Sequence, residues 1–317
     1  MESKCTIRQM EYLGTNKPVN RIKPVVSVCV VTYQHADFIK ECLDSILMQQ
    51  TAFPFEVIVG EDDSTDGTQD LCKVFAENHP DKVRLFLRSR KDVIYINSQP
   101  TGRFNSIENL RAARGLYVAL CEGDDYWTDP FKLQKQVDFM ESHPDFSLCF
   151  HDATLVDAEQ NTLQETFCHP RTTGEFPLTE FFNDNRTATC SKVFRTSAIM
   201  PLPEANHILA YDWLLSVQAG GCGKIYYFDE NWCAYRIHSA GQWQKMTEIE
   251  MKEAAYNALS GIDAYFGYEY REFILPSLSK RKLELARSYL SLNQYGSSFS
   301  CLFDSLRLRL LAMLESR

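Results

Sequence analysis

The chain has 317 residues, and 44% of them are hydrophobic, which is enough for a sizeable core in one large domain or in one domain with an appendage. Its formal net charge of −9 argues against broad electrostatic binding to nucleic acid or to anionic membranes, but leaves room for local basic patches. The 11 cysteines include no Cys-x-x-Cys pair, so we expect buried thiols in a reducing compartment. We recognise no signal peptide and no apolar run long enough to cross a bilayer, and therefore expect a cytoplasmic protein.

The first predicted unit is a strand followed by a helix. Residues 1–24 are polar and irregular, as in a leader or a partner contact. Residues 25–32 are almost continuously apolar, which is typical of a central strand in a parallel sheet, and residues 33–37 form the loop at its carboxyl end. Apolar residues then recur at helical spacing over 38–47, and we expect Asp37 to cap this helix.

An acidic loop follows the second predicted strand, residues 55–60. The loop at 61–67 resembles the opening of an EF-hand, but Lys73 stands where that calcium loop requires a glutamate, and a strand precedes it instead of a helix. We therefore expect Asp62 to contact a ligand, while Ser64 or Asp66 caps the next helix.

A long polar loop is predicted between the third strand, residues 83–87, and a helix at 107–115 that ends in glycine. This loop, residues 88–105, contains Arg103 and Asn105. The chain has neither a Gly-x-Gly-x-x-Gly turn after its first strand nor a Walker lysine loop, which disfavours dinucleotide-binding and P-loop folds.

Two adjacent aspartates follow the next predicted strand, residues 116–121. Gly123 allows a turn, and Asp124 and Asp125 then lie at the carboxyl end of the strand, where open α/β sheets bind their ligands. Two adjacent carboxylates repel each other unless a divalent cation neutralises them, and such a cation is itself bridged to phosphate oxygens. A metal-diphosphate site is the economical interpretation, and a polar turn that caps a helix is the alternative.

The remaining part of the sheet is predicted from strands at 147–152, 189–195, 225–228 and 232–238. Asp212 lies in the first turn of a helix predicted at 211–218, where a carboxylate is most simply explained by the helix dipole. A polar stretch at 157–176 has the character of a loop that contacts a variable partner. Four successive β-α steps with acidic loops at one edge predict a single, mostly parallel, doubly wound α/β domain of Rossmann type over residues 25–246.

A helical extension is predicted for residues 247–317. It carries an apolar stripe and nearby arginines, namely Leu302, Phe303, Leu306, Leu310 and Leu314 with Arg307, Arg309 and Arg317. The stripe can pack against the catalytic domain or a second subunit in a homodimer. Alternatively, it can dock on the inner face of a membrane that carries a lipid-linked acceptor.

Three motifs in this order resemble glycosyltransferase family 2, whose members have the GT-A fold. The motifs are VSVCVVTY at 26–33, EVIVGEDDSTDGT at 56–68 and ARGLYVALCEGDDYW at 113–127. The likeness covers about residues 25–240, and the order and gaps of the motifs are more specific than any one of them. The resemblance implies an inverting transfer of a sugar from a nucleotide sugar, a UDP-sugar, to a hydroxyl acceptor in the synthesis of cell-surface or capsular polysaccharide, O-antigen or a related glycan.

The resemblance also implies roles for individual residues. The nucleotide-sugar contacts implied or expected are Thr32, Tyr33, Asp62, Arg103, Asn105, Asp124, Asp125 and Arg236. Asp125 and His238 are the implied ligands of Mn²⁺ or Mg²⁺, and Asp212 is the implied catalytic base. Three positions depart from the family pattern: Glu61 stands where an aspartate is usual, Asp63 where a small residue is more common, and Tyr211 where a glutamate is usual.

Two other classes of protein stay open. A sugar-1-phosphate nucleotidylyltransferase would need a glycine-rich, basic loop after the first strand, and residues 33–37 are neither. A non-catalytic carbohydrate-binding or scaffold protein with this fold would not need both Asp212 and the aspartate pair. The expected partners are a nucleotide-sugar donor and a glycan or lipid-linked glycan acceptor, without nucleic acid and without a transmembrane span.

Overall fold

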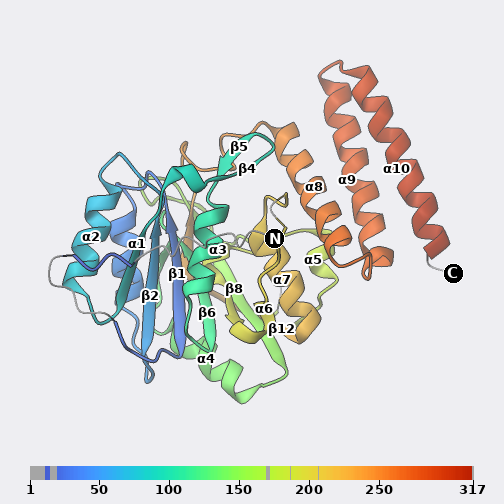
Figure 1. The fold of residues 1–317 in the computed structure, drawn as a ribbon. Coiled ribbons are helices and arrows are strands. Elements are labelled where there is room, and N and C mark those ends of the chain that lie inside the picture. The colour runs from blue at the N-terminus through green and yellow to red at the C-terminus, as the bar shows by residue number, and fades with distance from the viewer. Residues whose placement is uncertain (1–10, 15–19, 169–171, 186, 206, 316–317) are drawn as a thin grey trace, which may run out of the picture.

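A large central sheet with helices on both faces organises the computed structural model, which describes residues 11–14, 20–168, 172–185, 187–205 and 207–315 (Figure 1). The strand order is β10-β12-β8-β11-β6-β1-β2-β3. Neighbouring strands are parallel except where β11 and β10 pair with their neighbours. The predicted α/β fold with a mostly parallel, doubly wound sheet and a C-terminal helical extension is confirmed.

The amino-terminal half of the sheet contains four parallel strands, β1 (Val26–Thr32), β2 (Phe55–Glu61), β3 (Val83–Leu87) and β6 (Tyr117–Glu122). The helices between them are α1 (Ile39–Leu47), α2 (Thr68–Asn78) and α3 (Arg103–Ala112). Thr32 is in register with Glu61, and the preceding Val31 is in register with Glu122. The loops after β1, β2 and β6 therefore meet at one edge of the sheet.

The other half of the sheet is built from β8 (Phe146–Val156), β10 (Gly174–Phe176), β11 (Val193–Arg195) and β12 (Lys224–Arg236). The two strands predicted at 225–228 and 232–238 are one strand, β12, because a register irregularity near Asn231 lets it continue beside β8. The short strand β7 (Tyr126–Trp127) pairs with Cys233 and Ala234 of β12. The end of β12 is thereby held against the acidic turn that precedes β7.

Several local predictions are wrong. The helix α3 begins at Arg103, so Arg103 and Asn105 lie on a helix instead of in a loop. Residues 189–191 form a 3-10 helix, which leaves only Val193–Arg195 as a strand. Asp37 does not cap α1, whose N-cap is Phe38 without a side-chain hydrogen bond.

Shorter elements complete the domain. The short strands are β4 (Ile94–Ile96), β5 (Gln99–Thr101) and β9 (Thr162–Gln164). The remaining helices before residue 247 are the 3-10 helix Arg90–Asp92, α4 (Lys132–Ser142), α5 (Glu180–Asn183), α6 (Thr196–Ile199) and α7 (Tyr211–Cys222). The stretch at 157–176 thus contains β9 and the edge strand β10, within its described residues.

The C-terminal helices are α8 (Glu248–Tyr265), α9 (Arg271–Ser291) and α10 (Tyr295–Glu315). Leu259 and Ile262 of α8 and Ile274 of α9 belong to the same buried cluster as the core residues of β8 and α7. The extension is therefore joined to the main core through α8 and the start of α9, while α10 packs along α9 and projects outward (Figure 1). Within the described ranges, no helix is both long and apolar enough to cross a bilayer.

The predicted leader, residues 1–24, falls largely outside the described residues. In its described part, Glu11 forms a bridge with Phe86, and the Tyr12 N–H donates to the Leu85 carbonyl at 2.7 Å. This part of the leader therefore lies along the edge strand β3. The division of the chain at residues 24 and 246 stays a prediction.

Candidate active site

The acidic turn after β6 is pressed against the end of β1. The Asp125 N–H donates to the Glu122 carbonyl at 3.0 Å and closes the turn around Gly123. A side chain at Gly123 would place its Cβ 2.8 Å from Thr32 Oγ1 and 3.0 Å from His35 Nδ1, so only glycine fits this approach. Burial, together with Asp124 and Asp212, raises the pKa of Glu122 to about 8.

Asp124 lies between two histidines. Its Oδ2 is 3.0 Å from His238 Nε2 and 3.6 Å from His35 Nε2, and one ligand atom from each of the three residues falls within 4.8 Å of the others. Burial lowers the pKa of His35, so its imidazole is neutral at pH 7 and can bind a metal. Burial opposes ionisation of Asp124, but His35 and His238 hold its pKa below the ordinary value. Two imidazoles and a carboxylate are a donor set that suits a divalent transition metal such as Mn²⁺.

Asp125 is almost fully buried beside this group. Its Oδ1 accepts the Arg236 N–H at 2.9 Å, while its Oδ2 has no hydrogen-bond partner among the described residues. Burial raises the pKa of Asp125 well above its ordinary value, and Asp124 and Glu122 add to this effect. A buried carboxylate oxygen of this kind is costly unless a proton or a cation compensates it. Asp125 also falls into a second group of possible ligands, with Glu122 and Asp124.

Arg236 holds the turn in place. Its Nε donates to the Asp124 carbonyl at 2.8 Å, and its guanidinium forms an ion pair with Glu41 of α1 at 2.6 Å. The side chain is 1% exposed and lies over the ring of Phe38. Arg236 thus ties β12, α1 and the acidic turn together, and its predicted contact with phosphate stays a prediction.

The loop after β2 forms the other side of the site. Asp62 Oδ2 is 2.6 Å from an Arg90 guanidinium nitrogen, and the Arg90 guanidinium stacks 4.0 Å from the centre of the Tyr33 ring. Tyr33 is 40% exposed, whereas Thr32 is buried and its Oγ1 has no partner among the described residues. The structure therefore brings Thr32, Tyr33 and Asp62 to the same edge as the acidic turn, where the Tyr33 side chain is partly exposed.

Arg103 and Asn105 brace this edge from α3. Asn105 donates to the Gly60 carbonyl at 2.7 Å and accepts a hydrogen bond from Arg88. Arg103 donates to carbonyls of the segment before α7, including those of Ala205 and Leu209, each at 3.1 Å. Both side chains are buried in these contacts, and their predicted contacts with a nucleotide sugar stay predictions.

Asp212, the predicted base, forms an ion pair with a buried lysine. Its Oδ2 is 2.6 Å from Lys192 Nζ and 3.1 Å from Asn185 Nδ2. Burial opposes the charge of Asp212, but Lys192 and Asn185 hold its pKa below the ordinary value, so the carboxylate is ionised at pH 7. The Lys192 side chain is 0% exposed.

The sequence analysis missed six residues of this arrangement: Glu122, His35, Arg90, Lys192, Glu41 and Asn185. Glu122 directly precedes the Gly-Asp-Asp turn and so had a local signal, whereas Lys192 lies among mixed polar and apolar residues that do not distinguish it from a surface lysine. His35 and Arg90 lie in polar loops that give no such signal.

The sequence profile described as "Glycosyl transferase family 2" matches residues 27–202, which is more than half of the chain. The chain belongs to this family. A relative in Mycobacterium tuberculosis, "Uncharacterized protein Rv1520", is 32% identical over 261 residues, which cover 80% of this chain and 72% of the relative. The resemblance drawn from the three motifs is therefore confirmed.

Solved structures with the same fold include TarS and a mannosyltransferase. S. aureus TarS 1–349 in complex with UDP-GlcNAc has a TM-score of 0.53 and 17% identity, over 89% of this chain and 91% of that one. The mannosyltransferase PcManGT from Pyrobaculum calidifontis, in complex with GDP-Man and Mn²⁺, has a TM-score of 0.53 and 16% identity, over 94% and 88%. These neighbours confirm the GT-A fold for this family 2 glycosyltransferase.

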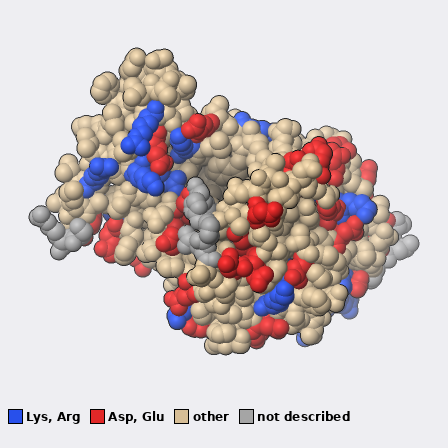
Figure 2. Space-filling view, turned by 180° about the vertical axis from the view of Figure 1, so that it is seen from behind, with Lys and Arg blue, Asp and Glu red and all other residues tan. Residues whose placement is uncertain are grey.

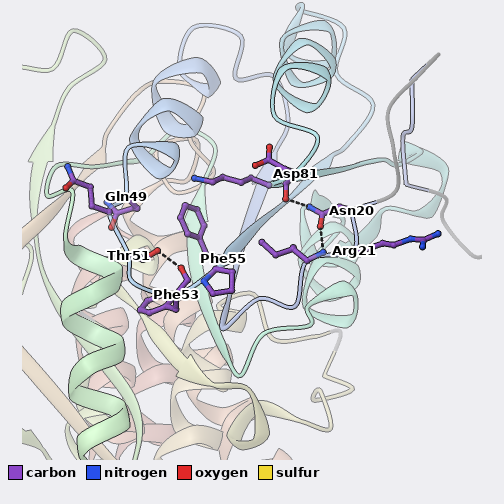
Figure 3. Close-up of a pocket in the computed structure, with 11 residues that line it drawn as sticks. Asn20, Arg21, Gln49, Thr51, Phe53, Phe55 and Asp81 are labelled. Atoms are coloured by element: carbon purple, nitrogen blue, oxygen red, sulfur yellow. Dashed lines mark hydrogen bonds between the residues drawn. The ribbon is translucent and has the colours of Figure 1, made fainter.

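A pocket of about 600 Å³ lies elsewhere on the glycosyltransferase domain (Figure 3). Its walls include Phe55, the first residue of β2, and Lys82, which directly precedes β3. These positions are at the amino ends of the parallel strands, whereas Asp62 and Asp124 follow carboxyl ends. The pocket is therefore at the opposite edge of the sheet from the candidate site.

Proposed function

We propose that this glycosyltransferase moves a sugar from a UDP-sugar to a hydroxyl group of a glycan or lipid-linked glycan, with inversion at the anomeric carbon. We assign the reaction to the synthesis of cell-surface or capsular polysaccharide, O-antigen or a related glycan. The observation that carries the proposal is the meeting of Asp124, His35 and His238 at the sheet edge that also carries the partly exposed Tyr33 and Asp62. Support also comes from the solved neighbours, whose complexes contain UDP-GlcNAc or GDP-Man with Mn²⁺.

The residues around Asp124 fit Mn²⁺ or Mg²⁺. Asp124, His35 and His238 offer an ionised carboxylate and two imidazoles, and the unpartnered Oδ2 of buried Asp125 offers a further oxygen. The two histidines favour Mn²⁺ over Mg²⁺, which prefers oxygen ligands. A divalent cation bound there supplies charge neutralisation for the diphosphate and its departure.

Asp212 is the proposed base because it is ionised and separate from the donor-binding carboxylates. It would accept the proton of the acceptor hydroxyl while that oxygen bonds to the anomeric carbon and the bond from this carbon to the UDP oxygen breaks. Lys192 and Asn185 would hold the carboxylate toward the acceptor. In this arrangement Tyr33 and Asp62 bind the nucleoside.

A donor screen tests this function. The chain is incubated with UDP-glucose, UDP-galactose, UDP-N-acetylglucosamine or GDP-mannose, with and without Mn²⁺, and release of free nucleotide is measured with water as the acceptor. We expect slow release of UDP from one of the UDP-sugars, and only with the metal. Release from GDP-mannose alone would overturn the assignment of UDP. Formation of a nucleotide sugar from a sugar 1-phosphate and UTP would show a nucleotidylyltransferase, and binding without turnover would show a carbohydrate-binding protein.

A further inference from the structure

The outermost helix, α10, carries its large apolar side chains on the side that faces away from the protein. Six of them form what we call the outer stripe, and each is between 56% and 71% exposed: Tyr295, Phe299, Phe303, Leu306, Leu310 and Leu314. Their spacing of three or four residues places them on one side of the helix along its whole length. A surface helix of a soluble protein normally turns such a stripe toward the core.

The side of α10 that packs against α9 has mostly small and polar residues, together with the partly buried Leu308. Ser298, Cys301 and Ser305 are the buried residues of this helix. Ser305 Oγ donates to the Ser279 carbonyl at 2.8 Å, and Ser298 Oγ donates to the Ala286 carbonyl at 2.8 Å. Close helix pairs joined by small and hydroxyl residues are typical of helices that associate in contact with lipid. The fully buried positions of α10 are therefore small or polar, whereas most of its large apolar side chains are exposed.

Basic side chains border the outer stripe. Successive residues are about 100° apart around a helix, so Arg307 and Arg309 lie on either side of the stripe, each roughly 70–90° from its centre. Both are exposed, and no ion pair joins either of them to a carboxylate in the described part of the chain. The helices α9 and α10 contain seven basic and four acidic residues, a net charge of +3, although the whole chain carries −9.

The two outermost helices thus have a net charge opposite in sign to that of the whole chain. Lys and Arg outnumber Asp and Glu on the visible part of the region formed by the C-terminal helices, while Asp and Glu prevail over the rest of the visible face (Figure 2). A surface with an apolar centre and basic borders matches a bilayer interface that contains anionic lipids, where acyl chains receive the apolar residues and headgroups meet the cations.

We propose that the outer stripe of α10, with Arg307 and Arg309, is a membrane-docking surface for anionic lipid bilayers. The helix would lie in the plane of the interface with the stripe in the acyl region. This inference goes beyond the proposed function and does not depend on it. It provides a physical reason why an enzyme of this kind would meet a lipid-linked acceptor.

A second copy of the chain is a less suitable occupant. If two copies of the stripe paired, the arginines along the borders of each would meet those of the other. The acidic residues of α10, Asp304 and Glu315, cannot compensate them, because Asp304 pairs with Lys282 at 3.1 Å and Glu315 lies 3.8 Å from Arg271. Like charges would therefore converge at the edges of such a dimer, whereas anionic headgroups would neutralise them.

Co-sedimentation of the full chain with vesicles tests the proposal. One set of vesicles contains phosphatidylcholine alone, and the other contains phosphatidylcholine mixed with phosphatidylglycerol. We expect binding to the mixed vesicles and little binding to the neutral ones. The double variant Phe303→Ser/Leu306→Ser should reduce the partition coefficient by about tenfold or more, because each side chain loses its transfer into the acyl region. Arg307→Gln/Arg309→Gln should reduce it by about tenfold, and only for the mixed vesicles.

A matched control comes from Leu116, which is 64% exposed but precedes β6, far from α10 in sequence. Leu116→Ser should leave vesicle binding unchanged, and UDP binding in solution should be the same for all variants because every substituted side chain is exposed. Equal sedimentation with and without vesicles for the unmodified chain would overturn the proposal. So would a dimer, seen by light scattering, that Phe303→Ser/Leu306→Ser dissociates while vesicle binding is absent, since the stripe would then be a contact between copies.

Discussion

Replacing Asp212 by asparagine should have two separable effects, because this residue is both the proposed base and the counter-ion of a buried lysine. At the observed 2.6 Å and an effective dielectric constant of about 20, the attraction between Asp212 and Lys192 is about 6 kcal/mol, and part of it offsets the burial of the ammonium group. Removing one partner of such a pair costs about 3–5 kcal/mol of folding free energy. Because the Asp212 side chain is 19% exposed, we expect a loss of folding free energy at the lower end of this range, about 3 kcal/mol. Loss of the base should reduce kcat by about 10²–10⁴-fold.

The double variant Asp212→Asn/Lys192→Met separates the two effects. It removes both charges, so urea unfolding should show stability close to that of the unmodified chain, while release of UDP stays as slow as in Asp212→Asn. UDP affinity, measured by calorimetry, should change little in either variant because the donor groups lie elsewhere.

Lys192→Met alone should retain activity but alter its dependence on pH. Lys192 holds the pKa of Asp212 below its ordinary value, so its removal raises that pKa, and the acid limb of the pH-rate profile should move to higher pH. Lys132→Met is the matched control, because Lys132 is also fully buried but donates to Gln136 and should not move the acid limb.

Near-normal turnover in Asp212→Asn would refute the assignment, as would a loss of UDP binding equal to the loss of turnover. The base would then be sought at Asp184, which is 49% exposed. Asp152 is a poorer candidate, since its Oδ1 already accepts three backbone N–H groups.

Two further substitutions test the donor side and its scaffold. Asp124→Asn removes the carboxylate shared by both groups of possible metal ligands. Calorimetry should therefore show that the expected gain in UDP affinity on adding Mn²⁺ falls by about tenfold or more. The control variant Asp145→Asn, at the opposite edge of the sheet, should leave this gain unchanged. Gly60→Ala should lower the free energy of unfolding by about 1–3 kcal/mol, because the new Cβ would lie 1.9 Å from Asn105 Oδ1. Gly102→Ala, where no atom lies within 4 Å of the new Cβ, should show no such loss in the same urea titration.

The parts of the fold that were predictable depend on local patterns. Continuous apolar runs mark buried parallel strands, and the polar residues that interrupt them mark strand ends, which is why Thr32, Asp62 and Asp124 were expected at one edge. The boundaries of α3 were harder to predict from the sequence. Its first turn contains Arg103 and Asn105, which are polar but buried, so the usual apolar periodicity of a helix is missing there.

The contacts within the site depend on pairs of residues that are distant in sequence. His35 meets Asp124 across 89 positions, and nothing in the polar loop around His35 distinguishes it from a surface histidine. Lys192 indicates a buried acidic partner only once the burial of the lysine itself is known. That partner, Asp212, lies in another element, α7. Pattern analysis therefore located the edge of the sheet where the site lies, but it could not identify which side chains meet there.

The attachment of β12 to the acidic turn has a consequence for synthesis of the chain on the ribosome. Asp125 accepts a hydrogen bond from the N–H of Arg236, which is 111 positions later in the chain. Asp124 contacts the imidazole of His238, which is 114 positions later. At typical elongation rates these partners emerge roughly 5–25 s after the turn itself. During that interval the carboxylates of the turn have neither the Arg236 N–H nor the His238 imidazole. A nascent chain halted before residue 236 should therefore be unable to retain a nucleotide, even with β1, β2 and β6 already paired.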